Sequence, residues 1–247
     1  MDNNFVSEMV GTGMLILFGD GVVAAVLLHR SKAENGGWIV ITTGWAMAVM
    51  IGVFAATYSG GLINPAVTIG FAVAGDLDWA DVPALLAGEF VGAFIGAVLV
   101  FLAYLPHWQP TEDPGLKLAV YSTGPAIRTT PWNLISEIIG TFVLVYVILA
   151  FGTVGPAGDN KAGLAALGPI PVAFLVLVIG LSLGGTTGYA INPARDLGPR
   201  IAHFILPIAG KRDSDWSYSW IPVVGPLVGG ALAAVIYTLT FTNFMLV

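Results

Sequence analysis

The tripeptide Asn-Pro-Ala occurs twice in the chain, 128 residues apart, as Asn64-Pro65-Ala66 and Asn192-Pro193-Ala194. Asn is among the best N-cap residues, because its side-chain oxygen accepts hydrogen bonds from the first turn of a helix. Pro suits the first helical position, where an N–H group would have no partner. The mostly apolar segments that follow, residues 65–74 and 193–204, are shorter than the roughly 20 residues that span a bilayer. Each motif therefore predicts a half-helix that enters a membrane without crossing it.

The composition indicates an integral membrane protein. Charged residues make up 10% of the chain, against about 25% in soluble domains, and apolar residues make up 56%. No Lys or Arg precedes the first apolar run, so we expect this run to remain as a helix rather than act as a cleaved signal. The net charge of −6 lies in loops and does not indicate a nucleic-acid partner. The chain has no cysteine and its three histidines lack ligand spacing, so we expect no metal and no cofactor.

Six long apolar segments predict six membrane-spanning helices in an all-α fold. They are residues 5–28, 38–56, 85–104, 134–151, 170–183 with their flanks, and 221–241. One half-helix falls between the second and third spans, and the other falls between the fifth and sixth. Each half of the chain thus holds three spans and one re-entrant segment. Because three is odd, the second copy is inverted relative to the first.

A second pair of segments supports the duplication. Glu8-Met9-Val10-Gly11-Thr12 in the first span recurs as Glu137-Ile138-Ile139-Gly140-Thr141 in the fourth, 129 residues later. We therefore expect a single domain over residues 1–247, with inverted repeats at about residues 1–105 and 132–247. The Pro-rich, polar stretch 106–131 is expected to be an ordered surface loop that links the two repeats.

Inversion has a physical consequence, because half-helices that enter from opposite faces meet near the middle of the membrane. Each N-terminus carries about half a positive charge from unpaired N–H groups. Non-helical backbone at that depth is tolerated where it lines a cavity. The amides of Asn64 and Asn192 would offer donors to a polar pore whose paired dipoles repel cations. For a single motif, capping alone is the simpler interpretation, but the inverted duplicate favours a pore.

The chain resembles the aquaporin, or major intrinsic protein, family over essentially its whole length, and within it the glycerol-facilitator branch. The resemblance is most specific in residues 184–200, GGTTGYAINPARDLGPR, and in residues 59–68, SGGLINPAVT. It implies an aquaporin-like right-handed bundle that passively conducts water and small neutral solutes such as glycerol. It also implies a homotetramer in the lipid bilayer, in which each subunit has its own pore.

By this resemblance, four residues are expected to form the selectivity filter: Trp45, Gly180, Tyr189 and Arg195. A charge inside the membrane normally faces a water-filled cavity or a partner, and the resemblance implies that Arg195 lines the narrowest part of the channel. Its donors can bind solute hydroxyl groups while its charge repels cations. The alternative is that Arg195 pairs structurally with the neighbouring Asp196.

The other filter positions are expected to set its width. Water-selective members of the family carry His where this chain has Gly180, and Gly leaves space for a carbon chain. Tyr189 stands where well-known members have Phe, and with Trp45 it would form an apolar corner for the C–H face of a polyol. Three alternatives stay open: Trp45 is a packing residue, Gly44 takes its place, or Gly180 belongs to a packing motif with Gly184.

Three acids are expected to hold the re-entrant loops in place. Glu8 and Glu137 occupy equivalent positions in the two repeats and resemble the buried glutamates that brace these loops in the family. Asp196 is likewise expected to brace its loop. Glu89 in the third span is ambiguous, and Asp20 in the first span has no role that the resemblance assigns.

Three classes of function are compatible with this pattern, and a passive channel for glycerol and other small neutral solutes, with water, leads. A channel chiefly for water or for a neutral small organic acid is the near alternative. A coupled secondary transporter also uses inverted repeats and broken helices. An enzyme is disfavoured, because no span pairs a nucleophile with a base.

The resemblance implies a multi-pass protein of the plasma membrane with both termini in the cytoplasm. The positive-inside rule favours the opposite orientation, because six basic residues would otherwise lie in outer loops: Arg30, Lys32, Lys117, Arg128, Lys211 and Arg212. Lys161 alone would lie in an inner loop. We follow the resemblance, since it places the filter at the outer mouth and since the rule predicts the translocation of long charged loops poorly.

Overall fold

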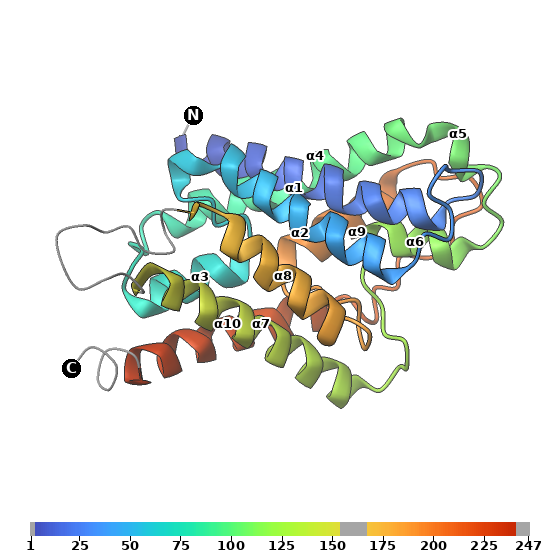
Figure 1. The fold of residues 1–247 in the computed structure, drawn as a ribbon. Helices are drawn as coiled ribbons and strands as arrows, with labels where there is room; N and C mark the ends of the chain where they lie inside the picture. Colours follow the sequence, from blue (N-terminus) through green and yellow to red (C-terminus); the bar gives the residue numbers. More distant parts are fainter. Residues whose placement is uncertain (1–2, 154–166, 241–247) are drawn as a thin grey trace.

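The computed structural model describes residues 3–153 and 167–240 as a bundle of helices (Figure 1). In chain order the long helices and their connections are α1 (Asn3–Leu27), α2 (Trp38–Ala55), the short 3-10 helix η1 (Thr57–Ser59), α3 (Pro65–Ala74), α4 (Val82–Ala103), α5 (Leu105–Trp108), α6 (Pro114–Tyr121), α7 (Thr130–Thr153), α8 (Ile170–Ser182), α9 (Pro193–Ile205) and α10 (Ile221–Thr240). These two described ranges contain no strand. The predicted all-α fold is confirmed.

Five helices of the described chain are long and apolar enough to cross a membrane: α1, α2, α4, α7 and α10. Helices α4 and α7 begin a few residues before the apolar segments of the sequence, because each starts at a residue that is followed by Pro. The remaining expected span, the fifth in chain order, corresponds to α8, whose 13 residues are too few to cross alone. Turns at residues 167–169 and 183–187 extend it on both sides.

The two predicted half-helices are α3 and α9, and each begins at the Pro of its tripeptide. They start close together and run apart, α3 toward the end of the molecule where α1 begins and α9 toward the opposite end (Figure 1). Each packs closely on the last span of the other repeat. A Cβ atom on Gly230 of α10 would lie 2.5 Å from the Ala66 carbonyl oxygen of α3, and one on Gly198 of α9 would lie 2.6 Å from Ala93 of α4. The repeats are therefore interlocked.

The stretch between the repeats is more structured than the surface loop that its sequence suggested. It contains α5 and α6, and Asp113 caps α6 by accepting a hydrogen bond from the Gly115 amide at 2.7 Å. The rings of Trp108 and Tyr121 are buried and stack with their centroids 5.5 Å apart. Because α6 packs against both α1 and α9, this stretch supports one side of the second half-helix.

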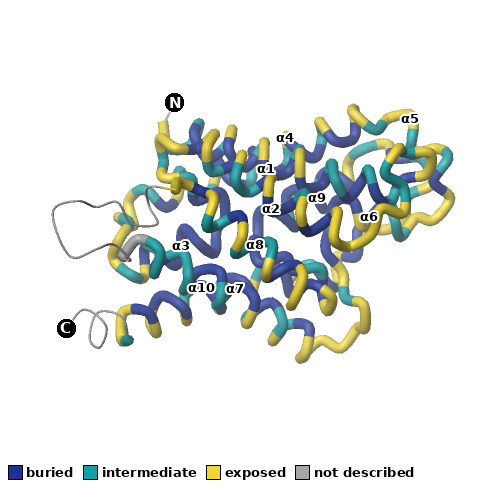
Figure 2. The backbone as a smooth tube through the Cα atoms, in the orientation of Figure 1, coloured by how far each residue is buried: buried dark blue, intermediate teal, exposed yellow. Residues whose placement is uncertain are grey.

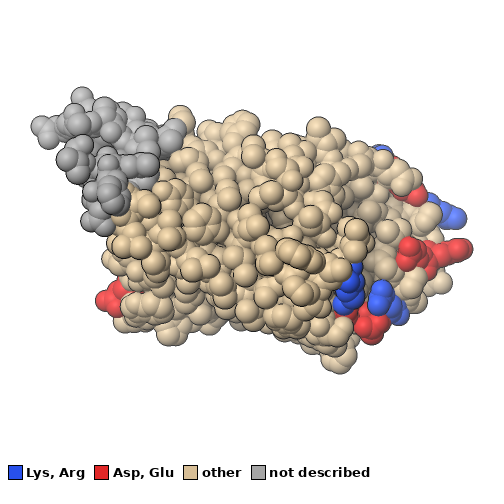
Figure 3. All heavy atoms as spheres, turned by 90° about the horizontal axis from the view of Figure 1, so that it is seen from below, with Lys and Arg blue, Asp and Glu red and all other residues tan. Residues whose placement is uncertain are grey.

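The lateral surface of the bundle is apolar. Large apolar side chains are exposed on α1, α2, α4, α7, α8 and α10, whereas the sides of these helices that pack against one another are buried (Figure 2). On the face drawn in Figure 3, a broad middle band has no charged residue, and most charged side chains gather at one end. This distribution is typical of a bundle that meets hydrocarbon around its middle and water at its ends.

Candidate functional site

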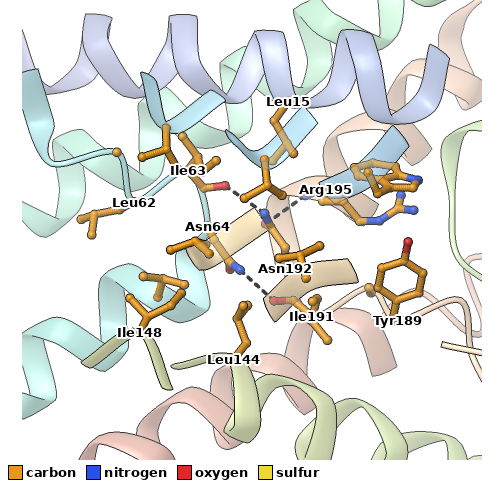
Figure 4. A pocket seen from close by; sticks show the side chains of 18 of the residues that line it. Leu15, Leu62, Ile63, Asn64, Leu144, Ile148, Tyr189, Ile191, Asn192 and Arg195 are labelled. Carbon is orange, nitrogen blue, oxygen red and sulfur yellow. Dashed lines mark hydrogen bonds between the residues drawn. The ribbon is translucent and has the colours of Figure 1, made fainter. Parts of the chain in front are cut away.

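The tripeptide asparagines cap the two half-helices where these meet at the centre of the molecule (Figure 4). Asn64 Oδ1 accepts a hydrogen bond from the Ala66 amide at 2.9 Å. Asn192 Oδ1 accepts hydrogen bonds from the amides of Ala194 at 3.0 Å and Arg195 at 3.1 Å. Both caps have the extended backbone that an N-cap residue requires.

The side-chain nitrogens of the same two residues cross between the repeats. Asn64 Nδ2 donates to the Ile191 carbonyl oxygen at 2.8 Å, and Asn192 Nδ2 donates to the Ile63 carbonyl oxygen at 2.9 Å (Figure 4). Ile63 and Ile191 have φ angles of 44° and 42°, a backbone region that is rare for β-branched residues. Each NH₂ group has two hydrogens, so each Asn keeps one donor for a molecule beside it. Capping and donation to a pore are thus compatible.

In the first repeat, one carboxylate holds the loop that enters the tripeptide. Glu8 of α1 is fully buried, and its Oε1 atom accepts hydrogen bonds from the Leu62 amide at 3.1 Å and the Ser59 hydroxyl at 2.6 Å. Its Oε2 atom accepts one from the Ile63 amide at 2.6 Å. These bonds satisfy backbone N–H groups that lie outside any helix, which is the condition for such backbone at membrane depth.

The second repeat has the same clamp. Glu137 of α7 accepts hydrogen bonds at Oε1 from the Thr187 hydroxyl at 2.6 Å and the Ala190 amide at 3.0 Å. Its Oε2 atom accepts one from the Ile191 amide at 2.9 Å. Glu8 and Glu137, two of the three acids expected to brace a loop, therefore each lie against the backbone of the loop in their own repeat.

Glu89 of α4 adds a contact that only the first repeat has. Its Oε1 atom accepts hydrogen bonds from the Asn64 amide at 3.2 Å and the Thr68 hydroxyl at 2.6 Å. Gly88 and Gly225 pack against the clamp residues Glu8 and Glu137 in matching ways, which makes Pro226 the counterpart of Glu89. Glu89 thus contacts the first tripeptide rather than a separate site.

A cavity of about 140 Å³ lies beside the meeting point of the half-helices, with room for several water molecules. Most of its wall is apolar, and the lining side chains that carry N–H or O–H groups are those of Asn64, Asn192, Arg195, Trp45 and Tyr189. The apolar part comes mainly from α1, α2, α3, α7 and α8: Leu15, Val49, Val53, Leu62, Val67, Phe71, Leu144, Ile148, Val172 and Val176. Such a wall with a few convergent polar groups is typical of a site for a small molecule.

Arg195 and Trp45 form one end of this cavity. The guanidinium carbon of Arg195 lies 3.9 Å from the centroid of the Trp45 ring, within the range of a cation–π contact. Gly44 faces elsewhere, because a Cβ atom there would lie 2.6 Å from Val22 of α1. Of the two residues considered for this filter position, the structure places Trp45 at the cavity.

Gly180 does not line the cavity, because Tyr189 lies over it. A Cβ atom on Gly180 would approach the Tyr189 ring to 2.9 Å and its hydroxyl oxygen to 3.1 Å, and one on Gly184 would approach the same ring to 2.4 Å. The Tyr189 ring also meets Trp38 edge-on, with centroids 5.8 Å apart. The space that Gly180 of α8 and Gly184 of the following turn leave is therefore filled by Tyr189, whose position in turn limits the cavity.

Asp196 bonds to Thr123, in the stretch that links the two repeats, and to Arg200, rather than to its own re-entrant loop or to Arg195. Its carboxylate accepts hydrogen bonds from the amide and hydroxyl of Thr123, both at 2.7 Å, and two from Arg200 at 2.8 and 3.0 Å. Arg200 also donates to the carbonyl oxygens of Thr123 and Ser214. The alternative in which Arg195 pairs with Asp196 is not what the structure has.

Two site residues were missed or left without a role at the sequence level. Arg200 follows Asp196 by one helical turn, a spacing that favours an ion pair and could have identified it. Asp20 has a carboxylate oxygen 3.7 Å from Arg195 Nη1, a contact between positions far apart in the chain that no local spacing could reveal.

Comparison with known proteins gives one consistent result. The family model described as Major intrinsic protein matches residues 1–237. The probable glycerol uptake facilitator protein of Thermotoga maritima is 56% identical over 96% of this chain and 99% of its own length, and the glycerol uptake facilitator protein of Bacillus subtilis is 52% identical over 96% and 84%. The X-ray structure of the aquaglyceroporin from Plasmodium falciparum superposes with a TM-score of 0.81 at 28% identity, covering 96% of this chain and 95% of that one.

Proposed function

The chain belongs to the major intrinsic protein family, and from this premise we propose that it is a passive channel for glycerol and other small neutral solutes. Its relatives named glycerol uptake facilitators confirm the branch that the sequence resembles. The protein is accordingly a channel and not an enzyme. Which residues act on the solute, and how, is the part that follows from the geometry of the site.

The observation that carries this proposal is the pairing of an apolar wall with a few donors around one cavity. A polyol has a C–H face and hydroxyl groups on the same short chain. The wall can contact the C–H face, while Asn64, Asn192 and Arg195 donate hydrogen bonds that replace those lost from water. We assign Trp45, Tyr189 and Arg195 to the narrow part of the filter, and Gly180 to the seat of Tyr189.

Exclusion of ions follows from the same groups. The two half-helices direct their N-termini toward each other, and their partial positive charges repel a cation that has shed its water. Arg195 adds a full charge within the cavity wall. Water is small enough to share the path with neutral solutes, so we expect both to pass.

Stopped-flow light scattering on proteoliposomes tests the function directly. We expect glycerol uptake faster than in empty vesicles, proportional to the gradient, and independent of ion or proton gradients. Rapid water flow with glycerol uptake no faster than in empty vesicles would contradict the proposed solute class and favour a water channel. Saturable uptake that depends on a proton or sodium gradient would instead indicate a coupled transporter.

We also propose a homotetramer in the plasma membrane with both termini in the cytoplasm. The start of α1 and the end of α10 lie at the same end of the molecule (Figure 1), as an even number of crossings requires. Most charged loops lie at the other end, which this orientation places outside (Figure 3). Lys161 lies outside the described residues.

Cysteine labelling in this Cys-free chain tests the orientation. Asp213→Cys and Asp76→Cys introduce thiols at exposed positions. An impermeant maleimide added to intact cells should label only the first variant, and the reverse pattern would contradict the orientation without affecting the channel. Chemical crosslinking and light scattering in detergent would test the tetramer.

A further inference from the structure

We propose that Asp20 of α1 is a positioning residue for the filter: its carboxylate compensates the charge of Arg195 and holds the guanidinium group in place over Trp45. This inference rests on the proposed function of the same cavity. Asp20 itself does not line the cavity, so its effect on the solute is exerted through Arg195.

The surroundings of Asp20 leave Arg195 as its counter-charge. Asp20 is fully buried, and neither carboxylate oxygen has a hydrogen-bond partner among the described residues. Arg195 Nη1 lies 3.7 Å from Oδ1. Arg200, on the same helix as Arg195, is occupied by Asp196 and by loop carbonyl groups. A buried acid in a membrane-spanning helix is costly unless it is paired, so the ion pair explains why an acid can stand there.

Helix α1 also acts on Arg195 indirectly, through the ring of Trp45. A Cβ atom on Gly19, the residue before Asp20, would lie 2.2 Å from the Trp45 ring. The Trp45 ring therefore lies against α1 at Gly19 and has Arg195 within cation–π distance. Two successive residues of α1 thus determine where Arg195 lies, Gly19 through the ring and Asp20 through its charge.

The distance between Asp20 and Arg195 leaves the N–H groups of the arginine available to a solute. At 3.7 Å the contact is electrostatic and lies outside the range of a direct hydrogen bond. Within the described part of the chain, the Arg195 side chain donates no hydrogen bond to protein. Its five N–H donors are therefore kept for hydroxyl groups of the solute, while Asp20 fixes the position of the group that carries them.

Compensation of charge predicts how ions behave when either partner is neutralised. In the parent protein the pair carries no net charge, although of the two residues Arg195 lines the cavity and Asp20 does not. Asp20→Asn leaves one positive charge, which should admit small anions such as formate and chloride while cations stay excluded. Arg195→Gln leaves one negative charge, which should admit cations or protons. In the double variant Asp20→Asn/Arg195→Gln no fixed charge remains, and both leaks should be smaller than in the corresponding single variant.

The experiment measures glycerol flux, water flux and ion leak in proteoliposomes of these four proteins. We expect Asp20→Asn to lower the ratio of glycerol to water flux by about threefold or more, and the double-mutant cycle to show non-additivity of similar size, because the two residues act as a unit. Asp20→Glu keeps the charge and should exclude anions as the parent does. Asp76→Asn, an exposed acid far from the cavity, should leave all three readings unchanged.

Several results would overturn the proposal. One is an Asp20→Asn protein with parental flux ratio and no anion leak; another is purely additive effects in the cycle. If Asp20→Asn does not fold, the pairing predicts that adding Arg195→Gln to it restores the yield of folded protein. A double variant with no higher yield would also refute the proposal. Failure of the parent protein to conduct glycerol would refute the proposed function. If the parent conducts glycerol and the Asp20 variants give the same fluxes and ion leak as the parent, only this inference is refuted.

Discussion

The two half-helix sites share a scaffold and differ in chemistry. Both have an Asn cap, a positive φ angle just before it, and a buried Glu that accepts three hydrogen bonds from the preceding loop. After the tripeptide they diverge. α3 contains no charged residue, whereas α9 has Arg195 directly after its tripeptide, where α3 has Val67, and Asp196 and Arg200 further along.

This difference shows which parts of the duplicated unit are structural and which are selective. The features present twice satisfy backbone groups at membrane depth, a requirement that both repeats face equally. Of the charged groups present once, Arg195 lines the cavity, where it can act on a solute that passes. Substitutions at residues that both repeats share, compared with substitutions at residues that only one repeat has, can therefore separate structural roles from selective ones.

Removal of the clamps should have the largest effect and the same effect in both repeats. Glu8→Ala and Glu137→Ala each leave two buried backbone amides without an acceptor, and Glu137→Ala also removes the acceptor of the Thr187 hydroxyl, at about 1–3 kcal/mol for each group. The sum rivals the whole stability of many domains. We expect both variants to be recovered at very low yield. Fluorescence-detected size-exclusion chromatography measures that yield.

Matched variants sharpen this test. Glu8→Gln and Glu137→Gln keep one acceptor oxygen and should be recovered at intermediate yield. If one Ala variant folds normally while the other does not, the two clamps are not equivalent, and the symmetry of the scaffold would hold in geometry only.

The symmetric features could largely be predicted from the sequence, because they depend on local chemistry. Asn followed by Pro specifies a helix start wherever it occurs, and a long apolar run specifies a span. The repeated segment that begins at Glu8 and Glu137 indicated equivalent roles, and the structure gives them equivalent contacts. The start of α4 was placed a few residues late, since hydropathy does not register the Pro in its first turn.

The asymmetric features could be predicted only in part, because they depend on how distant helices are rotated against one another. The pair of Asp20 with Arg195 requires α1 and α9 to present particular faces, which composition and spacing do not fix. The side-chain direction of Tyr189 follows from Gly180, from Gly184 just after α8, and from a positive φ of 39° at Tyr189 itself. The sequence indicated Gly180 as a source of space but not which group fills it.

Gly180→His tests the asymmetric filter, with an effect of intermediate size. The added side chain would collide with the Tyr189 ring and push it toward the cavity, at about 1–3 kcal/mol of overpacking. Glycerol flux should fall by roughly tenfold, which corresponds to ~1.4 kcal/mol, and water flux should fall much less. Stopped-flow measurements with both solutes give the ratio.

A second substitution, at a neighbour of Gly180 on α2, supplies the control. Thr42 of α2 also touches the space beside Gly180, and its hydroxyl donates to backbone carbonyl groups of its own helix. Gly180→His combined with Thr42→Ala should recover part of the glycerol flux by giving the imidazole room. Equal loss of water and glycerol flux in Gly180→His, with normal folding, would mean that Gly180 serves helix packing alone.

The smallest expected effect concerns the loop network beside α9, which ties Arg128 to Asp215. Partial burial raises the pKa of the Asp215 carboxyl, but hydrogen bonds from Arg128 and Ser217 outweigh burial and bring this pKa below its usual value. A group with a lowered folded-state pKa stabilises the protein above its unfolded-state pKa, about 3.9 for Asp, and this contribution is lost as the pH falls through the folded-state pKa. Arg128 is half exposed, so the pair should contribute less than about 1 kcal/mol.

Arg128→Ala should therefore lower the midpoint of thermal unfolding slightly near pH 7, and the difference from the parent should shrink toward pH 3. Arg212→Ala, which removes the exposed pair with Asp213, should change nothing at either pH. A difference for Arg128→Ala that stays constant from pH 7 to pH 3 would assign its contribution to packing over the Tyr218 ring rather than to the charge of Asp215.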